Sequence, residues 1–151
     1  MTNRKKENAL ILSQEEIASG IFSLWLKTEA AGQARPGQFI SMYTNDGSRL
    51  LPRPISICEI DRGREAHRVV YRVTGPDTGT ELFSRMKAGD VIPVIGPLGN
   101  GFPMERAEGK RVFLIGGGIG VPPILELAKQ LNCEKKQIVV GYRNKETFLR
   151  N

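Results

Sequence analysis

The sequence predicts a mainly β fold, a small antiparallel Greek-key barrel followed by the start of an α/β doubly wound domain. Short apolar runs recur through the first hundred residues, separated by Gly, Pro, Asp and Asn, which is typical of a small barrel or sandwich. After about residue 104 the pattern changes to strand, glycine loop, helix and strand, the opening of a doubly wound domain. We therefore predict a barrel domain at 1–104 and a truncated α/β domain at 105–151.

The expected barrel strands are short apolar or alternating segments bounded by turn residues. They cover residues 8–13, 17–28, 38–43, 50–60, 67–73 and 91–95. The clearest alternation lies in 67–73, where successive apolar residues share one face of a strand. We expect Trp25 and Phe39 in the core. His67 starts its strand, and we expect it to be exposed or to cap the strand.

One helix interrupts the strands of the barrel, and the pattern predicts it over 79–87. Phe83 and Met86 lie on its apolar side. Thr80 can cap the start of this helix, and Gly89 follows its end. The loop before it, residues 74–79, is rich in small residues.

The second part of the chain reads as a strand–loop–helix–strand unit. Residues 111–115 and 137–142 are predicted as buried parallel strands, with a glycine loop at 116–120 between the first strand and the helix. Pro122 and Pro123 fit the first turn of that helix. A parallel sheet of only two strands has an open edge and little core. We therefore expect the chain to be a piece of a longer protein.

Composition and charge narrow the classes of function. Hydrophobic residues make up 40% and charged residues 25% of the 151 residues, as in a globular protein with a core. No apolar run approaches the ~20 residues that cross a bilayer, and the basic N-terminus lacks a signal-peptide pattern. The net charge of +6 is spread along the chain and indicates nucleic-acid binding only weakly. We expect a cytoplasmic protein with no membrane and no nucleic-acid partner.

The content of cysteine and histidine argues against a metal site. Cys58 and Cys133 lie far apart, neither has a CxxC partner, and His67 is the single histidine. Two reduced thiols are therefore expected rather than a disulfide or a metal ligand set. No Ser-His-Asp set, carboxylate pair or nucleophilic cysteine stands out, so we assign no catalytic side chain.

Several residues together could bind a flavin dinucleotide. Its pyrophosphate needs cations and backbone donors, which Arg53, Arg72 and the helix start at 79–80 offer. Its ring needs hydrogen-bond partners, and Ser56 follows Pro54 on the same side of a strand. Each of these features alone is common in purely structural settings, so their order and combination carry the hypothesis.

Five motifs appear in the same order over nearly the whole chain as in one family. The chain resembles the electron-transfer subunits of bacterial dihydroorotate dehydrogenase, within the ferredoxin reductase-like flavoproteins. The matching segments are PGQF (36–39), LPRPISI (51–57), VYRVTGPDTGTELF (70–83), GDVIPVIGPLGNGF (89–102) and GGGIGVPP (116–123).

The resemblance implies a ferredoxin reductase-like FAD-binding barrel. It places Arg53 near the pyrophosphate and Ser56 near the reactive edge of the flavin. This chain has Ile55 where many ferredoxin reductases carry tyrosine. The resemblance implies a role in pyrimidine biosynthesis, in a hetero-oligomer with a dihydroorotate-oxidising catalytic subunit. Reducing equivalents would pass from that subunit through FAD towards NAD. The implied FAD-site residues are Arg53, Pro54, Ile55, Ser56, Val70, Tyr71, Arg72, Gly79 and Thr80.

The glycine loop has two interpretations. It can cradle the pyrophosphate of NAD in the intact protein through Gly116, Gly117, Gly118 and Gly120, or it can be a tight turn that needs glycine for backbone reasons. The acidic ribose partner expected after the second strand is absent, since residues 143–144 are Arg-Asn. The family also carries a cysteine-rich segment for a [2Fe-2S] cluster, and these cysteines are absent from this chain.

Two other functions stay open at this point. The chain can be another ferredoxin reductase-like NAD(P)H oxidoreductase component. It can also be a non-catalytic binding or assembly module that keeps the barrel with a vestigial flavin site. The three functions differ in flavin content and in the partner that they require.

Overall fold

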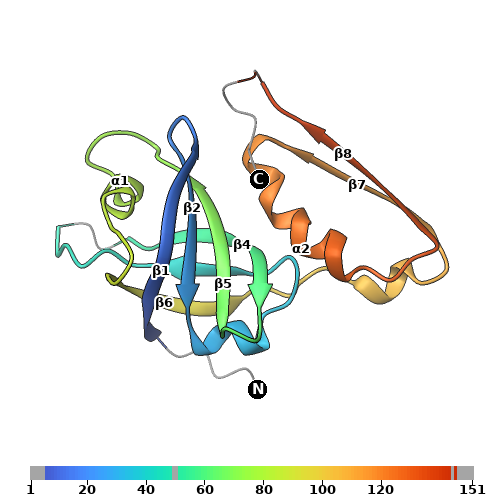
Figure 1. Cartoon of the computed structure of the whole chain (residues 1–151), viewed down its shortest axis with the longest axis horizontal. Helices are drawn as coiled ribbons and strands as arrows, with labels where there is room; N and C mark the ends of the chain where they lie inside the picture. The colour runs from blue at the N-terminus through green and yellow to red at the C-terminus, as the bar shows by residue number, and fades with distance from the viewer. Residues whose placement is uncertain (1–5, 49–50, 144, 146–151) are drawn as a thin grey trace.

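The computed structural model describes residues 6–48, 51–143 and 145 (Figure 1). Six antiparallel strands close into a barrel in the order β1-β2-β5-β4-β3-β6, and β7 and β8 form a separate parallel sheet. Strands β2 to β5 lie in the Greek-key order 2-5-4-3. This confirms the predicted fold class. The strands are β1 (Lys6–Ala18), β2 (Ile21–Lys27), β3 (Phe39–Met42), β4 (Arg53–Asp61), β5 (Ala66–Arg72), β6 (Val91–Leu98), β7 (Arg111–Gly117) and β8 (Lys135–Gly141).

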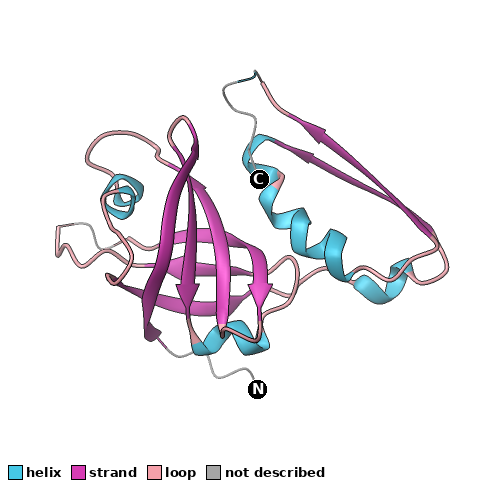
Figure 2. Ribbon diagram, viewed as in Figure 1, coloured by secondary structure: helices cyan, strands magenta, loops and turns pink. Residues whose placement is uncertain are grey.

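Short helical elements connect these strands. The two α-helices are α1 (Gly79–Ser84), between β5 and β6, and α2 (Pro122–Gln130), between β7 and β8. Within residues 6–48 and 51–143, the 3-10 turns are η1 (Glu29–Gln33), η2 (Met104–Ala107) and η3 (Gly118–Gly120). Figure 2 shows the barrel strands gathered on one side and the β7–α2–β8 unit on the other. No described helix is long and apolar enough to span a bilayer.

The segment predicted as one strand over 17–28 contains the turn of a β-hairpin, with the end of one strand before the turn and a second strand after it. β1 continues to Ala18, and β2 begins at Ile21 after a two-residue turn. Gly20 has a φ of +67° in this turn, a backbone conformation that residues other than glycine rarely adopt. The mixed apolar pattern hid this turn, because β1 and β2 contribute apolar residues immediately before and after it. β6 likewise runs on to Leu98, beyond the predicted end at 95.

The barrel core is a single cluster of apolar side chains from all six strands and α1. Its buried members are Ala9, Ile11, Leu24, Leu26, Ala34, Ile40, Met42, Ile57, Val69, Tyr71, Phe83, Ile92 and Val94. Met86 packs against this cluster, as predicted. Trp25 and Phe39, expected in the core, are only half-buried, and Trp25 lies under the guanidinium of Arg64 at 5.7 Å.

His67 is fully buried, so its predicted exposure is wrong. Alternation along β5 puts it on the same face as Val69 and Tyr71, which point into the core. Its Nδ1 lies 3.2 Å from the hydroxyl of Thr28, and among the described residues its Nε2 has no partner. Burial lowers the pKa of His67 to about 4, because the charged imidazolium is poorly solvated there.

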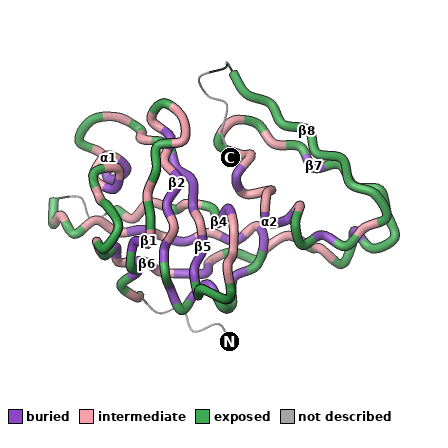
Figure 3. Tube along the Cα trace, in the orientation of Figure 1, coloured by how far each residue is buried: buried purple, intermediate pink, exposed green. Residues whose placement is uncertain are grey.

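The parallel pairing of β7 and β8 is confirmed, but the predicted burial of these strands is wrong. α2 covers one face, where Leu114 packs with Leu127 and Leu131. On the other face Phe113 is 64% and Ile115 is 74% exposed, and β8 is exposed along its length (Figure 3). One helix cannot cover both faces of a sheet whose sequence is apolar on both.

The β7–α2–β8 unit is attached to the barrel through α2 and β4. The second half of β4 extends beyond its pairing with β3, so its backbone groups on that side need other partners. The buried carboxylate of Glu126 accepts a hydrogen bond from the Ile60 N–H at 2.9 Å, and Lys129 forms an ion pair with Glu59. The boundary predicted between 104 and 105 falls within η2 and stays a prediction.

Candidate functional site

A cavity of about 350 Å³ opens where β4, β5, the start of α1 and the start of α2 meet. The cavity is lined by every residue predicted for the flavin site except Gly79, which lies against Arg53 beside the cavity. The lining residues are Arg53, Pro54, Ile55, Ser56, Val70, Tyr71, Arg72, Thr74, Thr80, Ile119 and Pro123. Two of them are arginines and none is acidic, so the lining favours an anionic ligand.

Alternation along β4 divides the Arg-Pro-Ile-Ser segment between two faces. Ile55 packs against the barrel core, whereas Pro54 and Ser56 are exposed on the opposite face. Ser56, exposed on this face, is one of the residues that line the cavity. Pairing with β3, which places Phe39 opposite Ser56, holds this segment extended.

Arg53 and Gly79 form one corner of the site. The Nε of Arg53 is buried and has no hydrogen-bond partner among the described residues. A Cβ on Gly79 would lie 3.1 Å from this Nε and 3.3 Å from the Cγ2 of Thr44, closer than side chains normally pack. Glycine at this position therefore lets the arginine lie against the helix start. A buried donor without an acceptor is costly, so this corner is suited to an anionic ligand.

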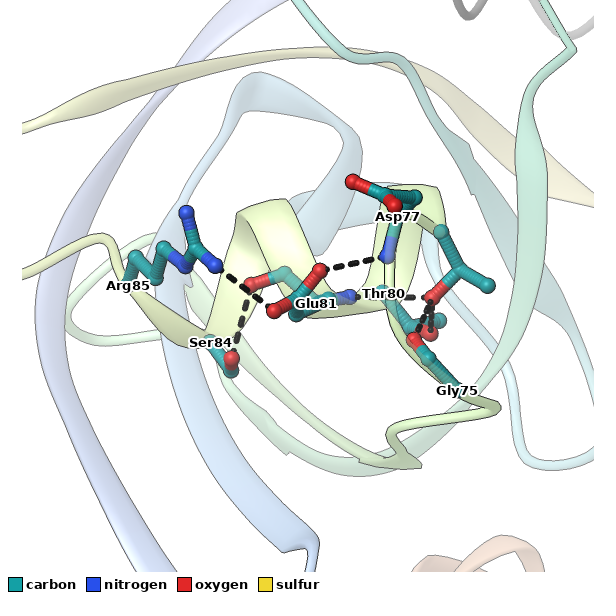
Figure 4. A network of polar contacts seen from close by, with 7 residues as sticks. Gly75, Asp77, Thr80, Glu81, Ser84 and Arg85 are labelled. Carbon is teal, nitrogen blue, oxygen red and sulfur yellow. Dashed lines mark hydrogen bonds and ion pairs between the residues drawn. The ribbon is translucent and has the colours of Figure 1, made fainter.

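Three threonines fix the start of α1 against the end of β5. The Thr80 hydroxyl accepts a hydrogen bond from the Thr74 N–H at 3.0 Å, and it lies 3.1 Å from the Thr74 hydroxyl and 3.0 Å from that of Thr78. Thr78 caps the helix by accepting a hydrogen bond from the Glu81 N–H; Figure 4 shows Thr80 and Glu81 at this start of α1. The prediction that Thr80 is the cap is therefore wrong by two positions. The helix also ends earlier than predicted, at Ser84.

The β5 wall is built from backbone more than from side chains. Val70 and Tyr71 are buried, at 5% and 1% exposure, so they turn little of their side chains to the cavity. The Tyr71 hydroxyl donates to Oε1 of Gln14 at 2.7 Å, and burial raises the pKa of this phenol. Arg72, in contrast, is exposed at the cavity.

The glycine loop reaches the cavity with one residue, Ile119, and the helix after it adds Pro123. Gly116 is required by packing, because a Cβ there would lie 3.0 Å from Ile124 Cδ1. A Cβ on Gly120 would meet nothing within 4 Å, so this glycine borders open space. The structure thus gives Gly116 a role in the tight turn, and NAD binding by the loop stays a prediction. Arg143 is exposed, and position 144 lies outside the described residues.

The two cysteines do not form a disulfide. Cys58, a residue of β4, is buried on the side of the strand that faces α2, and Cys133 is half-buried. Burial raises the pKa of the Cys58 thiol to about 12, so it stays protonated at neutral pH. No group of three potential metal ligands occurs within residues 6–48, 51–143 and 145.

Sequence reasoning did not identify Thr74, Ile119 or Pro123 as parts of the site. Thr74 had a signal, since it opens the small-residue loop before α1. Ile119 and Pro123 had none, because their approach depends on how α2 packs against β4. Gln14, which holds Tyr71, also lies far away in sequence.

Comparison with known proteins identifies relatives of the chain. No family model matches the chain. The chain is 44% identical to the "Dihydroorotate dehydrogenase B (NAD(+)), electron transfer subunit" of Streptococcus mutans, over 95% of the chain and 56% of that protein. It is also 44% identical to the protein of the same name from Enterococcus faecalis, over 95% of the chain and 55% of that protein. The chain therefore spans about half the length of these relatives.

Solved structures agree with this result. The chain superposes on an NADH-dependent reduced ferredoxin-NADP oxidoreductase with a TM-score of 0.81 and 29% identity, covering 95% of this chain and 51% of that one. A ferredoxin NADP+ reductase from Neisseria gonorrhoeae, solved with bound FAD and NADP, gives a TM-score of 0.80 at 18% identity, covering 95% and 60%. This second likeness shows the fold alone. Over the half of their length that it spans, the chain is therefore a homologue of the dihydroorotate dehydrogenase B electron transfer subunits.

Proposed function

We propose that the chain is an FAD-binding electron-transfer module and that the cavity at Arg53 is its flavin site. The observation that carries this proposal is the Arg53–Gly79 corner, where the buried Nε–H of Arg53 has no acceptor among the described residues and a Cβ at position 79 would crowd it. The lining of the cavity beside it includes a second arginine, Arg72, and Ser56. These are the groups that a pyrophosphate and a polar ring edge require.

Each wall has its own part in binding. Arg53 and Arg72 neutralise the phosphates, while Thr80 and the backbone at Gly79 border them. Ser56 offers a hydrogen bond to the edge of the ring, and Ile55, which packs into the core, keeps the floor of the slot rigid. FAD, when bound, supplies the redox chemistry, and the protein sets its orientation and its access to water.

In the longer protein, we infer, reducing equivalents pass from a dihydroorotate-oxidising catalytic subunit to this site and on to NAD. The names of the relatives support this role, since they are electron transfer subunits of an NAD(+)-dependent enzyme. The glycine loop between β7 and α2 is the part that would bind NAD there. The two cysteines of this chain cannot by themselves supply the four thiolates that an iron–sulfur cluster normally needs.

Flavin content tests the binding proposal directly. The purified chain should be yellow, and heat denaturation should release FAD, identified by chromatography. If the protein is purified without flavin, titration with FAD should restore the flavin absorbance band at one FAD per chain. A correctly folded chain that neither carries nor takes up FAD would refute the proposal.

A second experiment separates this role from the two alternatives. The FAD-loaded chain is mixed with a dihydroorotate dehydrogenase catalytic subunit, and dihydroorotate is added without oxygen. Bleaching of the flavin band only when both proteins are present supports the electron-transfer role. Bleaching by NAD(P)H alone, with no effect of the catalytic subunit, would favour another ferredoxin reductase-like component. Failure to bleach under either condition would favour a non-catalytic module.

A further inference from the structure

Gln14 of β1 connects three separate elements of the barrel. Its amide Nε2 lies 2.9 Å from the carbonyl oxygen of Phe83 and 2.6 Å from that of Met86, at the end of α1. Its Oε1 accepts the hydroxyl of Tyr71, from β5, at 2.7 Å. α1 lies against the side of the barrel formed by β1 (Figure 1).

The orientation of this amide is fixed by its partners. Backbone carbonyls only accept hydrogen bonds, so the amide nitrogen must face Phe83 and Met86 and the amide oxygen must face Tyr71. Tyr71 is itself held in place, stacked on Phe22 at 5.8 Å and meeting the edge of Phe83 at 6.3 Å. Gln14, in this one orientation, therefore ties the end of α1 to β1 and β5, in addition to the packing of Phe83 and Met86 against the core.

The other end of α1 borders the proposed flavin site. Gly79 begins the helix against Arg53, and the Thr80 hydroxyl links it to Thr74. The helix runs only from Gly79 to Ser84, so a shift at its end moves its start as well. The position of the Arg53–Gly79 corner thus depends on Gln14, although Gln14 is not among the residues that line the cavity.

We propose that Gln14 is a positioning residue for the phosphate corner of the flavin site, and that it acts through α1. This inference rests on the proposed function. Gln14 supports the corner that takes the pyrophosphate, whereas Ile55 and Ser56, which border the ring, are held by β4 and its pairing with β3. Loss of Gln14 therefore weakens the hold on phosphate and leaves the environment of the ring unchanged.

The test compares two ligands on Gln14→Met, which keeps the length of the side chain and removes its hydrogen bonds. We expect the Kd for FAD to rise about tenfold, a loss of about 1.4 kcal/mol, because the corner that holds the phosphate is no longer fixed by the three hydrogen bonds of Gln14. The Kd for riboflavin, which has the ring and no phosphate, and the absorbance spectrum of bound FAD should stay unchanged. Glu15→Met, an exposed neighbour on the same strand, is the matched control and should bind both ligands like the wild type.

Tyr71→Phe provides an independent variant, because it keeps the ring packing and removes only the hydroxyl that orients Gln14. It should weaken FAD binding in the same selective way and to a smaller extent. An unchanged Kd for FAD in both variants would overturn the inference. So would an equal loss for FAD and riboflavin, or a shifted flavin spectrum, because either result indicates general loosening of the site. A wild-type chain that fails to bind FAD refutes the proposed function itself.

Discussion

Replacement of Arg53 by methionine tests the central contact of the proposed flavin site. Methionine keeps much of the apolar stem and removes the guanidinium. In the ligand-free protein the buried Nε of Arg53 has no hydrogen-bond partner among the described residues, so its removal breaks no hydrogen bond of that atom there. The substitution should therefore separate ligand binding from folding.

The size of the effect follows from the type of contact. A charge-assisted hydrogen bond to phosphate contributes about 1.5–3 kcal/mol, so losing it should raise the Kd for FAD roughly 10- to 150-fold. A buried donor without an acceptor costs about 1–3 kcal/mol, so removing it offsets the lost packing of the stem. The free energy of unfolding without FAD should therefore change by less than about 1 kcal/mol.

The assay is a fluorescence titration with FAD, combined with denaturant unfolding of the ligand-free protein. Arg64→Met is the control, since Arg64 is exposed, lies over Trp25 and does not line the cavity. FAD should bind this control like the wild type. The reasoning is refuted if Arg53→Met binds FAD normally, or if it unfolds the ligand-free chain, because Arg53 would then be a structural residue.

Three further predictions follow from single contacts. Gly79→Ala should raise the Kd for FAD several-fold, because its Cβ would lie 3.1 Å from the Nε of Arg53; an unchanged Kd in the same titration would contradict the proposed corner. The free energy of unfolding should fall as pH drops from 6.5 to about 4, by about 3 kcal/mol in total, because the unfolded chain protonates His67 whereas burial lowers its pKa in the fold to about 4. This slope, measured by denaturant unfolding across the pH range, should be reduced in His67→Gln, and equal slopes would exclude His67 as the cause. Glu126→Ala should lower the free energy of unfolding by about 0.5–1.5 kcal/mol, since the N–H of half-buried Ile60 loses its acceptor; in Glu126→Gln, where an oxygen remains, thermal unfolding should show a smaller loss.

The barrel could be predicted because its strands carry local signals. Alternating apolar residues mark β5, and glycine and proline mark the turns. The hairpin between β1 and β2 escaped prediction, because apolar residues flank Gly20 closely and the pattern continues across it. His67 was misjudged although its alternation with Val69 and Tyr71 already placed it on the inner face.

The burial of β7 and β8 could not be predicted from their composition. Phe113 and Ile115 have the apolar character of buried strand residues, yet they are exposed because α2 covers only the opposite face. Sequence patterns report which residues favour burial, whereas the elements that cover them decide whether burial is achieved.

The sequence alone determined the succession of strands along the chain, apart from the turn between β1 and β2. It also determined the helix before β6 and identified the Arg-Pro-Ile-Ser segment as a candidate flavin contact. These features are local, since strand period, turn residues and short motifs involve neighbours in the chain. Only the tertiary structure decided that Arg53 lies against Gly79, that Ile119 and Pro123 join the cavity, and that Gln14 holds α1 in place. These contacts join residues far apart in sequence, and they form only because the barrel closes and α2 packs against β4.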